Sequence, residues 1–590
     1  MLCLRCLGDK CADRAYIRLS IRIVINSKQF PACPTAPAER MKMSAKFLPD
    51  SLVVAMRDGE ELITRVWKPA GKGPFPVILE RGYDPGIDWH AERFVDSAYV
   101  YVGQQCRGNL QGGMFRTDNI DGYDCMDWIV GQPWCNGDIA MYGRSFMAAT
   151  QILTAPEHHP NLRAIVPQMI NPSIWERGYW DHGALQLSHV ARRIYRTKVA
   201  DDMTYKVAEY GGWDAFYRHL PLITLDTAVV GAPNNLWQEY VGHSEYGPYW
   251  SDISTHEKID QIEVPTYLHA GWYDNYPSAL LKVFGKLQNA GKIDDLRIHI
   301  GPTDHMGDVV GDRPFGEHAF QQQLEIAIRW LDYVVKGEEN GISDEPTITY
   351  FTMGVNQWRA ANTWPPETVV LTNFYFRNFE ESAELRHASL STKMPLDESP
   401  TKYDYDPNNP VPTLGGNHSS PQDHPEIIRV GVLDHRPNWE REDVLVFETD
   451  ALEASIEVTG PITASLYAST SAPDTDFIVR LLDVEPGGTA WNLTEGIIRS
   501  RFRKGIYDPP ELLKPGEVFK YEIELLPTSN VFMEGHRIAV HVTSSSFPMY
   551  DRNPNTGHKQ GMDSELEIAH QTVFHDVGRP SHVTLPIVQG

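Results

Sequence analysis

The segment MYGRSFMAATQ, Met141 to Gln151, decides how this chain folds. The residues IAMYG before Ser145 are typical of a strand, and FMAATQILTA after it is typical of a helix. Ser145 therefore lies on a turn between a strand and a helix. Two interpretations fit this position: a nucleophile exposed on a strained turn, or a serine that caps a buried helix.

A nucleophile on such a turn needs small neighbours, because the backbone bends sharply there. Gly143 meets this requirement two positions before Ser145, but Met147 stands two positions after it, where a small residue is usual. Ala148 and Ala149 follow instead. The segment alone leaves both interpretations open.

Two later polar residues favour the nucleophile. LHAGWYDNY places Asp274 just after a strand, and IHIGPTDH places His305 in the loop after the next strand. Catalytic residues collect at such strand ends, and the order Ser, Asp, His suits a nucleophile of this kind. The alternatives are Asp274 as a helix cap and His305 as one of 22 ordinary histidines. His269 lies within a strand and is the weaker candidate for the base.

The same chemistry requires hydrogen-bond donors for a developing oxyanion. The backbone N–H of Phe146, directly after the serine, is one candidate. The phenolic O–H of Tyr83 in ERGYDPG, a loop that follows an earlier strand, is the second. Taken alone, Tyr83 fits a packing role equally well.

Patterns along the chain indicate three kinds of structure. From Leu52 onward a hairpin around Asp58-Gly59 leads into alternating strands and helices, which predict a parallel α/β sheet. Residues 171–254 are predicted to form helices only. After Pro365, alternating and β-branched runs predict a β-sandwich of the jelly-roll type. Residues 387–424, rich in Pro and Asn, are expected to form a long surface loop.

Composition limits the partners and the compartment. The net charge of −25 argues against nucleic acids and anionic membranes, and no apolar run is long enough to span a bilayer. We expect a small-molecule substrate, with a homo-oligomer compatible with the sequence. No cysteine follows Cys135, which favours a reducing, cytoplasmic compartment.

The first 40 residues differ from the rest, with seven Lys and Arg against three Asp and Glu. They are interpreted either as a targeting segment or as an extension that adds nothing to the fold. Cys3 and Cys6 have the C-x2-C spacing of a zinc ligand pair, but no second pair and no histidine follow nearby, so no metal site is expected.

Several motifs in order carry a resemblance to a known family. RGYDPG, CRGNLQGG, DGYDCMDWIVGQPWCNGDIAMYGRSFMAATQ, GWYDNY and GPTDH resemble the cocaine esterase-like and Xaa-Pro dipeptidyl-peptidase-like (S15) serine hydrolases. VTGPITASLYASTSAPDTDFIVRLLDVEPGG and GHRIAVHVTSSSFPMYDRNPNTG resemble the jelly-roll domain of that family. In this family an aromatic residue follows the serine and Gly or Ala stands three positions after it, so Met147 does not depart from the pattern.

The resemblance implies an α/β-hydrolase core with an inserted helical cap and a C-terminal jelly roll. The expected boundaries are an extension at 1–40, core at 41–170 and 255–364, cap at 171–254 and jelly roll at 365–590. It also implies a Ser145–His305–Asp274 triad, with Tyr83 and Phe146 at the oxyanion, and it requires no cofactor or metal.

The residues that follow Asp274 narrow the range of expected substrates. The α-amino acid ester hydrolases of this family carry acidic residues there, whereas this chain has Asn275 and Tyr276. Residues 1–40 are too short for the folded N-terminal domain of the large dipeptidyl-peptidases. We therefore expect hydrolysis of esters or amides in preference to removal of Xaa-Pro dipeptides. Tyr276 and Trp180 are candidates for the acyl pocket, with plain cap packing as the equal alternative for Trp180.

A hypothesis of a different class is a non-catalytic protein that binds carbohydrate or a partner through the jelly roll and carries a degenerate hydrolase core. The presence of Ser145, Asp274, His305 and Tyr83 together argues against it.

Overall fold

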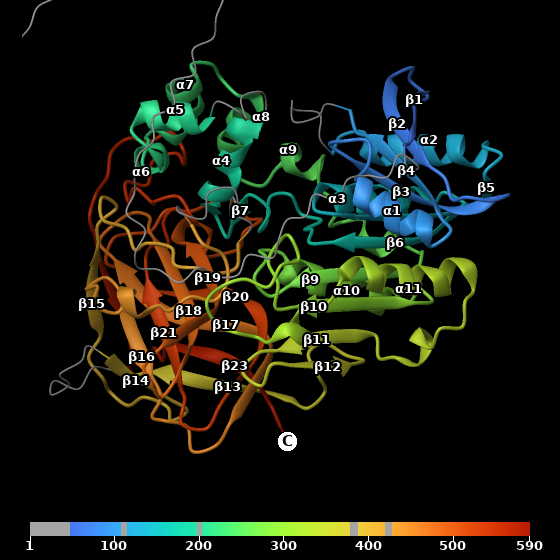
Figure 1. Cartoon of the computed structure of the whole chain (residues 1–590). Helices are drawn as coiled ribbons and strands as arrows, with labels where there is room; N and C mark the ends of the chain where they lie inside the picture. Colours follow the sequence, from blue (N-terminus) through green and yellow to red (C-terminus); the bar gives the residue numbers. More distant parts are fainter. Residues whose placement is uncertain (1–47, 108–114, 197–202, 378–386, 419–427, 590) are drawn as a thin grey trace, which may run out of the picture. The chain divides into compact units, whose positions relative to one another are not determined.

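The computed structural model describes residues 48–589, except 108–114, 197–202, 378–386 and 419–427 (Figure 1). The expected extension at 1–40 and the Cys3–Cys6 pair lie outside the described residues. No helix in the described part of the chain combines the length and the apolarity needed to cross a bilayer.

A ten-stranded sheet forms the first half of the fold, in the order β1-β2-β4-β3-β5-β6-β9-β10-β11-β12. The strands from β4 to β11 run parallel, while β1, β2 and β12 are antiparallel to their neighbours. The strands are β1 Asp50–Ala55, β2 Glu61–Trp67, β3 Phe75–Gly82, β4 Val100–Gln105, β5 Cys135–Arg144, β6 Leu162–Gln168, β9 Thr266–Gly271, β10 Leu296–Gly301, β11 Ile348–Thr352 and β12 Gln357–Ala361.

The strand order creates the place for a site. β4 lies on one side of β3 and β5 on the other, so the sheet changes the direction in which it adds strands at this point. In open parallel sheets, ligands bind in the crevice at the carboxyl ends of strands where this reversal occurs. Tyr83 directly follows β3 and Ser145 directly follows β5, which places both residues at that crevice.

Helices cover both faces of this sheet. Both α3 and α11 contact β5 and β6, and five consecutive residues of β5 are buried, as is typical of a strand covered on both faces. Gly122 allows α2 to approach α3 closely, because a Cβ at this position would lie 2.2 Å from the hydroxyl oxygen of Thr154. The helices are α1 Asp88–Asp96, α2 Asp118–Val130, α3 Phe146–Thr154, α10 Pro277–Ala290 and α11 Gln323–Lys336.

The segment between β6 and β9 corrects one expectation. It was predicted to be helical throughout, but it begins with a short hairpin formed by β7, Trp180–Asp181, and β8, Ala184–Leu185. His182 and Gly183 have φ values of 45° and 91°, which is the backbone that a two-residue hairpin turn requires. The helices that follow are α4 Leu187–Arg196, α5 Met203–Tyr210, α6 Trp213–Tyr217, α7 Leu225–Val230, α8 Asn235–Gly242 and α9 Pro248–Ser251.

The C-terminal part is built from strands, as predicted. β18 is buried at all nine positions, because both of its faces are covered. The strands are β13 Val369–Phe376, β14 His387–Ser391, β15 Thr401–Tyr405, β16 Leu445–Glu448, β17 Ile456–Thr470, β18 Asp476–Val484, β19 Ala490–Arg499, β20 Phe519–Phe532, β21 Arg537–Thr543, β22 Ala569–Val573 and β23 His582–Val588.

The prediction of a long surface loop at 387–424 was wrong in its described part. β14 and β15 lie within it, and β15 pairs with β22. Burial alternates along β15, with Thr401, Tyr403 and Tyr405 facing inward. The period-2 pattern of TKYDY was a strand signal that the surrounding prolines and asparagines concealed.

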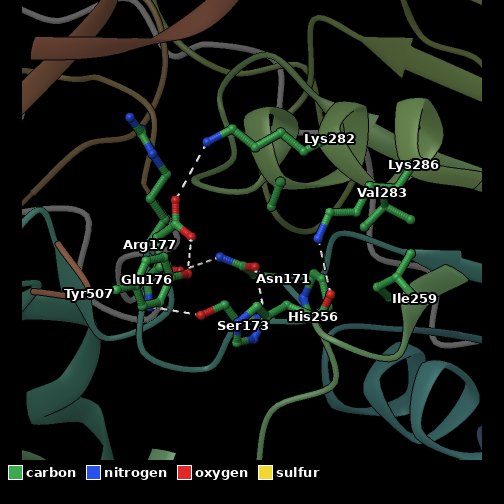
Figure 2. Close-up of a pocket in the computed structure, with 12 residues that line it drawn as sticks. Asn171, Ser173, Glu176, Arg177, His256, Ile259, Lys282, Val283, Lys286 and Tyr507 are labelled. Atoms are coloured by element: carbon green, nitrogen blue, oxygen red, sulfur yellow. Dashed lines mark hydrogen bonds and ion pairs between the residues drawn. The ribbon is translucent and has the colours of Figure 1, made fainter. Parts of the chain in front are cut away.

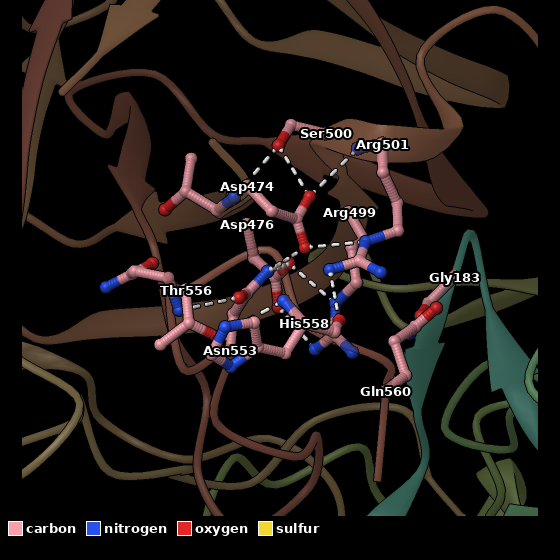
Figure 3. Close-up of polar contacts among 12 residues, drawn as sticks. Gly183, Asp474, Asp476, Arg499, Ser500, Arg501, Asn553, Thr556, His558 and Gln560 are labelled. Carbon is pink, nitrogen blue, oxygen red and sulfur yellow. Dashed lines mark hydrogen bonds and ion pairs between the residues drawn. The ribbon is translucent and has the colours of Figure 1, made fainter. Parts of the chain in front are cut away.

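The β7–β8 hairpin docks on the C-terminal domain through buried polar contacts. The N–H of Leu185 donates to Asp551 at 2.8 Å, and the hydroxyl of Tyr550 donates to Asp181 at 2.8 Å. The side-chain amide of Gln560 donates to the carbonyl of Gly183 at 2.6 Å (Figure 3). The hairpin is therefore fixed by residues that lie more than 350 positions later in the sequence.

Arg499 joins the carboxylates at this docking point. Its guanidinium donates to both oxygens of Asp476 at 2.9 Å and to both oxygens of Asp551 at 2.9 and 3.1 Å. All three side chains are almost fully buried. A buried carboxylate that loses its cation is costly, because neither water nor another charge replaces it.

We predict that Arg499→Met lowers the free energy of unfolding by about 3–5 kcal/mol, since it leaves Asp476 and Asp551 buried without their cation. The matched control is Arg163→Met, which breaks a surface pair with Asp138 and is expected to cost less than about 1 kcal/mol. Thermal unfolding of the two variants measures the difference. Equal midpoints for both variants would contradict the importance assigned to Arg499.

Candidate active site

Ser145 adopts the backbone of a nucleophile on a strained turn. β5 ends at Arg144, α3 begins at Phe146, and Ser145 between them has φ 60° and ψ −120°. Its N–H donates to the carbonyl of Gln168 on β6 at 2.9 Å. A non-glycine residue at positive φ costs about 1–3 kcal/mol, so the surrounding structure must hold it there. The side chain makes no capping hydrogen bond to α3, which disfavours the helix-cap interpretation.

Two glycines on neighbouring strands, Gly143 in β5 and Gly82 in β3, leave space for the side chain of Met147. Gly143 has φ 149°, and a Cβ at this position would lie 2.4 Å from the Cβ of Met147. A Cβ at Gly82, the last residue of β3, would lie 2.8 Å from the Cγ of Met147. Met147 can replace the usual small residue because its side chain lies over backbone that carries no side chain of its own.

The structure brings together Ser145, His305 and Asp274, the three residues that the sequence identified as candidates. Nε2 of His305 lies 3.0 Å from Oγ of Ser145, 160 positions away in the sequence. Nδ1 of His305 lies 2.9 Å from Oδ1 of Asp274, whose carboxyl group is buried. With Nδ1 donating to the carboxylate, Nε2 is left as the acceptor that can take the hydroxyl proton.

Two polar residues that the sequence did not identify hold the loop that carries His305. Oδ1 of Asp304 accepts from the N–H groups of Met306 at 2.8 Å and Asp308 at 3.0 Å, and burial raises the pKa of this carboxyl group. Arg144 donates through Nη1 to the carbonyl of Met306 and through Nη2 to Oε1 of Gln323 at 2.9 Å. Arg144, the residue before Ser145, is thus hydrogen-bonded to Met306, the residue after His305.

His269 does not belong to this relay. It is fully buried, and its Nδ1 lies 3.2 Å from the side-chain amide of Gln168. Burial lowers its pKa well below the ordinary value, and the neighbouring His299 and Arg144 lower it further. His269 is therefore neutral and packs under the site, as its position within a strand predicted.

Tyr83 and Phe146 lie side by side at the serine. Their rings are stacked with centroids 4.6 Å apart, and both residues line the same cleft as Ser145. The N–H of Phe146 belongs to the first residue of α3, so it has no acceptor within the helix and remains suited to bind an anion. The cleft is small, with a volume of about 30 Å³.

The two residues expected in the acyl pocket have different positions. Tyr276 lines the cleft, and its ring centroid lies 5.7 Å from that of His305. Trp180 is buried in the cap, where its indole N–H donates to the carbonyl of Tyr240 at 3.2 Å. Its neighbour Tyr179 lines the cleft instead, and so does His189, whose ring stacks on Tyr179. The β7–β8 hairpin, which the sequence did not predict, turns Trp180 away from the cleft.

Together, this fold and this site define a serine hydrolase of the α/β-hydrolase class. The sequence profile of the X-Pro dipeptidyl-peptidase (S15 family) matches residues 58–307, and that of the X-Pro dipeptidyl-peptidase C-terminal non-catalytic domain matches residues 340–584. Cocaine esterase of Rhodococcus sp. (strain MB1 Bresler) is 32% identical over 577 residues, which cover 91% of this chain and 98% of that protein. The chain belongs to this S15, cocaine esterase-like family of serine hydrolases.

Solved structures share the whole architecture. An aminopeptidase from the marine sediment archaeon Thaumarchaeota archaeon has a TM-score of 0.77 at 24% identity, over 94% of this chain and 99% of that one. An α-amino acid ester hydrolase has a TM-score of 0.77 at 22% identity, over 94% of this chain and 100% of that one. These likenesses show that the fold is common to proteins with different named activities.

We predict that Arg144→Met lowers kcat about 10- to 100-fold with little change in KM, because it removes two charge-assisted hydrogen bonds, one to the His305 loop and one to Gln323 of α11. Arg144→Lys keeps the charge but not the two-pronged geometry, so it should recover only part of the rate. Steady-state kinetics with a nitrophenyl ester measures both values. A full rate in Arg144→Met would show that the loop holds His305 without this contact.

Proposed function

We propose that this protein hydrolyses carboxylic esters through an acyl-enzyme intermediate on Ser145. The hydrogen-bonded relay from Ser145 through His305 to Asp274 carries this proposal. Nε2 of His305 accepts the proton of the Ser145 hydroxyl as Oγ attacks the ester carbonyl carbon. Asp274 accepts the hydrogen bond from Nδ1 and stabilises the imidazolium that forms.

The oxyanion that develops on the carbonyl oxygen is stabilised by the N–H of Phe146 and the O–H of Tyr83. His305 then gives its proton to the leaving alkoxide, and the alcohol departs from the acyl-enzyme. A water molecule, deprotonated by His305, attacks the acyl carbonyl and releases the carboxylic acid and the free Ser145 hydroxyl. The steps use the side chains of Ser145, His305, Asp274 and Tyr83, the backbone N–H of Phe146 and one water molecule.

The cleft favours an apolar acyl group. Tyr276, Tyr179, Phe115 and Ile174 give it aromatic and aliphatic walls, and Asn171, Ser173 and His189 add polar groups. We assign to Tyr179 the contact expected of Trp180. Asn275, where the α-amino acid ester hydrolases have an acidic residue, donates to Oε1 of Gln186 at 3.1 Å and offers no negative charge to an amine. These features support an ester without a free amine as substrate.

Removal of Xaa-Pro dipeptides is the second candidate, because the S15 sequence profile matches the catalytic half of the chain. A non-catalytic role in binding is the third. The two experiments below separate these alternatives from ester hydrolysis.

We predict that a fluorophosphonate probe labels the wild-type protein and does not label Ser145→Ala. The relay activates only this hydroxyl, so the probe has no other nucleophile of comparable reactivity in the cleft. Gel fluorescence and mass spectrometry of the labelled peptide provide the readout. Persistent labelling of the alanine variant would remove Ser145 from the mechanism, and an unlabelled wild type would favour the binding protein.

We predict that kcat/KM for short-chain nitrophenyl esters exceeds that for Gly-Pro-nitroanilide by more than about tenfold, which corresponds to 1.4 kcal/mol of transition-state binding. The reason is that the cleft offers apolar contacts to an acyl chain and no carboxylate at Asn275 for a peptide amine. Both reactions release a coloured product and are measured in the same assay. A preference for the anilide would reverse the ranking in favour of a dipeptidyl-peptidase.

The thiols support a further proposal, that the protein works in a reducing, cytoplasmic compartment. Cys106, Cys125 and Cys135 are all free in the described part of the chain, and the first two are buried. Burial raises the pKa of the Cys106 thiol well above its ordinary value, so it stays protonated and unreactive.

A further inference from the structure

A second cavity lies next to the Ser145 cleft and plays no part in the mechanism above. It has a volume of about 280 Å³ and is lined by four parts of the fold (Figure 2). These are the segment from Asn171 to Arg177 after β6, the segment from His256 to Ile259 before β9, one face of α10, and Tyr507 of the C-terminal domain. Its volume is close to the lower end of the range for small-molecule sites in proteins.

Two lysines one helical turn apart reach toward the cavity from α10 (Figure 2). The ammonium of Lys282 is already paired, at 3.1 Å from Glu524 and 3.5 Å from Glu176. The ammonium of Lys286 instead donates to the backbone carbonyl of His256 at 3.1 Å. Within the described residues, no carboxylate lies at ion-pair distance from Lys286, so its positive charge is available to an anionic ligand.

Two residues of the cavity lining also carry a buried nitrogen atom without a hydrogen-bond partner. Nε of Arg177 and Nδ1 of His256 are buried and have no hydrogen-bond partner among the described residues, although Nε of Arg177 lies 3.8 Å from the carboxylate of Asp181 in an ion pair. Buried polar atoms without partners are uncommon, and each one calls for an explanation such as a ligand or an ordered water. Burial lowers the pKa of His256, Glu257 raises it, and Lys286 lowers it again, with a net lowering that favours the neutral imidazole.

The other side of the lining is aliphatic. Pro172, Ile259, Ala279 and Val283 present carbon atoms to the same space. A ligand that matches the cavity therefore combines one negative group with an apolar body. A carboxylate fits the compact ammonium of Lys286, and a short hydrocarbon chain fits the aliphatic wall.

We propose that this cavity binds a small organic carboxylate, with the carboxylate on Lys286 and the hydrocarbon chain against Val283 and Ile259. The chain as a whole carries a net charge of −25 and repels anions at long range, so binding depends on these local contacts. The site is separate from the triad and goes beyond ester hydrolysis.

The cavity and the Ser145 cleft share a wall. Asn171 and Ser173 line both spaces. They belong to a turn in which the N–H of Ser173 donates to Oδ1 of Asn171 at 2.9 Å and the N–H of Glu176 donates to Oγ of Ser173 at 3.1 Å. A carboxylate bound in the second cavity thus contacts the outer side of the turn that forms the wall of the cleft.

The test uses hexanoate and its neutral isostere hexanamide as probes, and the Ser145→Ala protein, so that no turnover occurs. Titration followed by saturation-transfer NMR at low ionic strength, where exposed charges are least screened, gives both dissociation constants. We expect hexanoate to bind at least about tenfold more tightly than hexanamide, as a hydrogen bond to a charged group implies.

Lys286→Gln should weaken hexanoate binding about tenfold and leave hexanamide unchanged. The matched control is Lys292→Gln, which removes the same charge from an exposed pair with Glu263 outside the cavity and should leave both probes unchanged. Ala279→Phe fills the space from α10 and should abolish binding of both probes, with folding checked by circular dichroism. Equal affinity for the two probes, or an unchanged hexanoate affinity in Lys286→Gln, would overturn the proposal, whatever the protein does to esters.

Discussion

The left-handed backbone of Ser145 is the constraint on which the site depends. Ser145 lies at the end of β5, and contacts with neighbouring residues hold its strained turn in place. The carbonyl of Gln168 holds the N–H of Ser145 from β6, and Met147 lies over Gly143 and Gly82, where any side chain would collide with it. The strain of about 1–3 kcal/mol is offset by the packing of α3 and β5 in the sheet.

The central residues of the site could be predicted from the sequence, because each of them follows a recognisable strand. Ser145 follows a strand, Asp274 and His305 follow two later strands, and parallel strands place their carboxyl ends on one edge. The alternation of strands and helices is equally local, which is why the α/β sheet and the C-terminal β domain agree with expectation. What remained open was the choice between nucleophile and helix cap at Ser145; the contact with His305 and the lack of a capping hydrogen bond favour the nucleophile.

The sequence could not predict features that depend on contacts between distant residues. The turn at His182 and Gly183 forms a hairpin that packs against Asp551 and Gln560. No pattern in the sequence around Trp180 predicts these contacts. Tyr179 therefore takes the place in the cleft that was expected of its neighbour. Arg144 likewise carried no signal, since its partners Met306 and Gln323 meet it only in the folded sheet.

The docking of the hairpin also changes how the C-terminal domain should be regarded. This domain supplies no member of the proposed triad, yet Arg177 donates to the carbonyl of Glu524 in β20. Ser278, two residues after Tyr276, donates to the carboxylate of the same glutamate. β20 therefore contacts both the segment after β6 and the start of α10, which lie beside residues that line the Ser145 cleft. We therefore expect a change in these β20 contacts to alter the shape of the cleft, although no described residue of the C-terminal domain lines it.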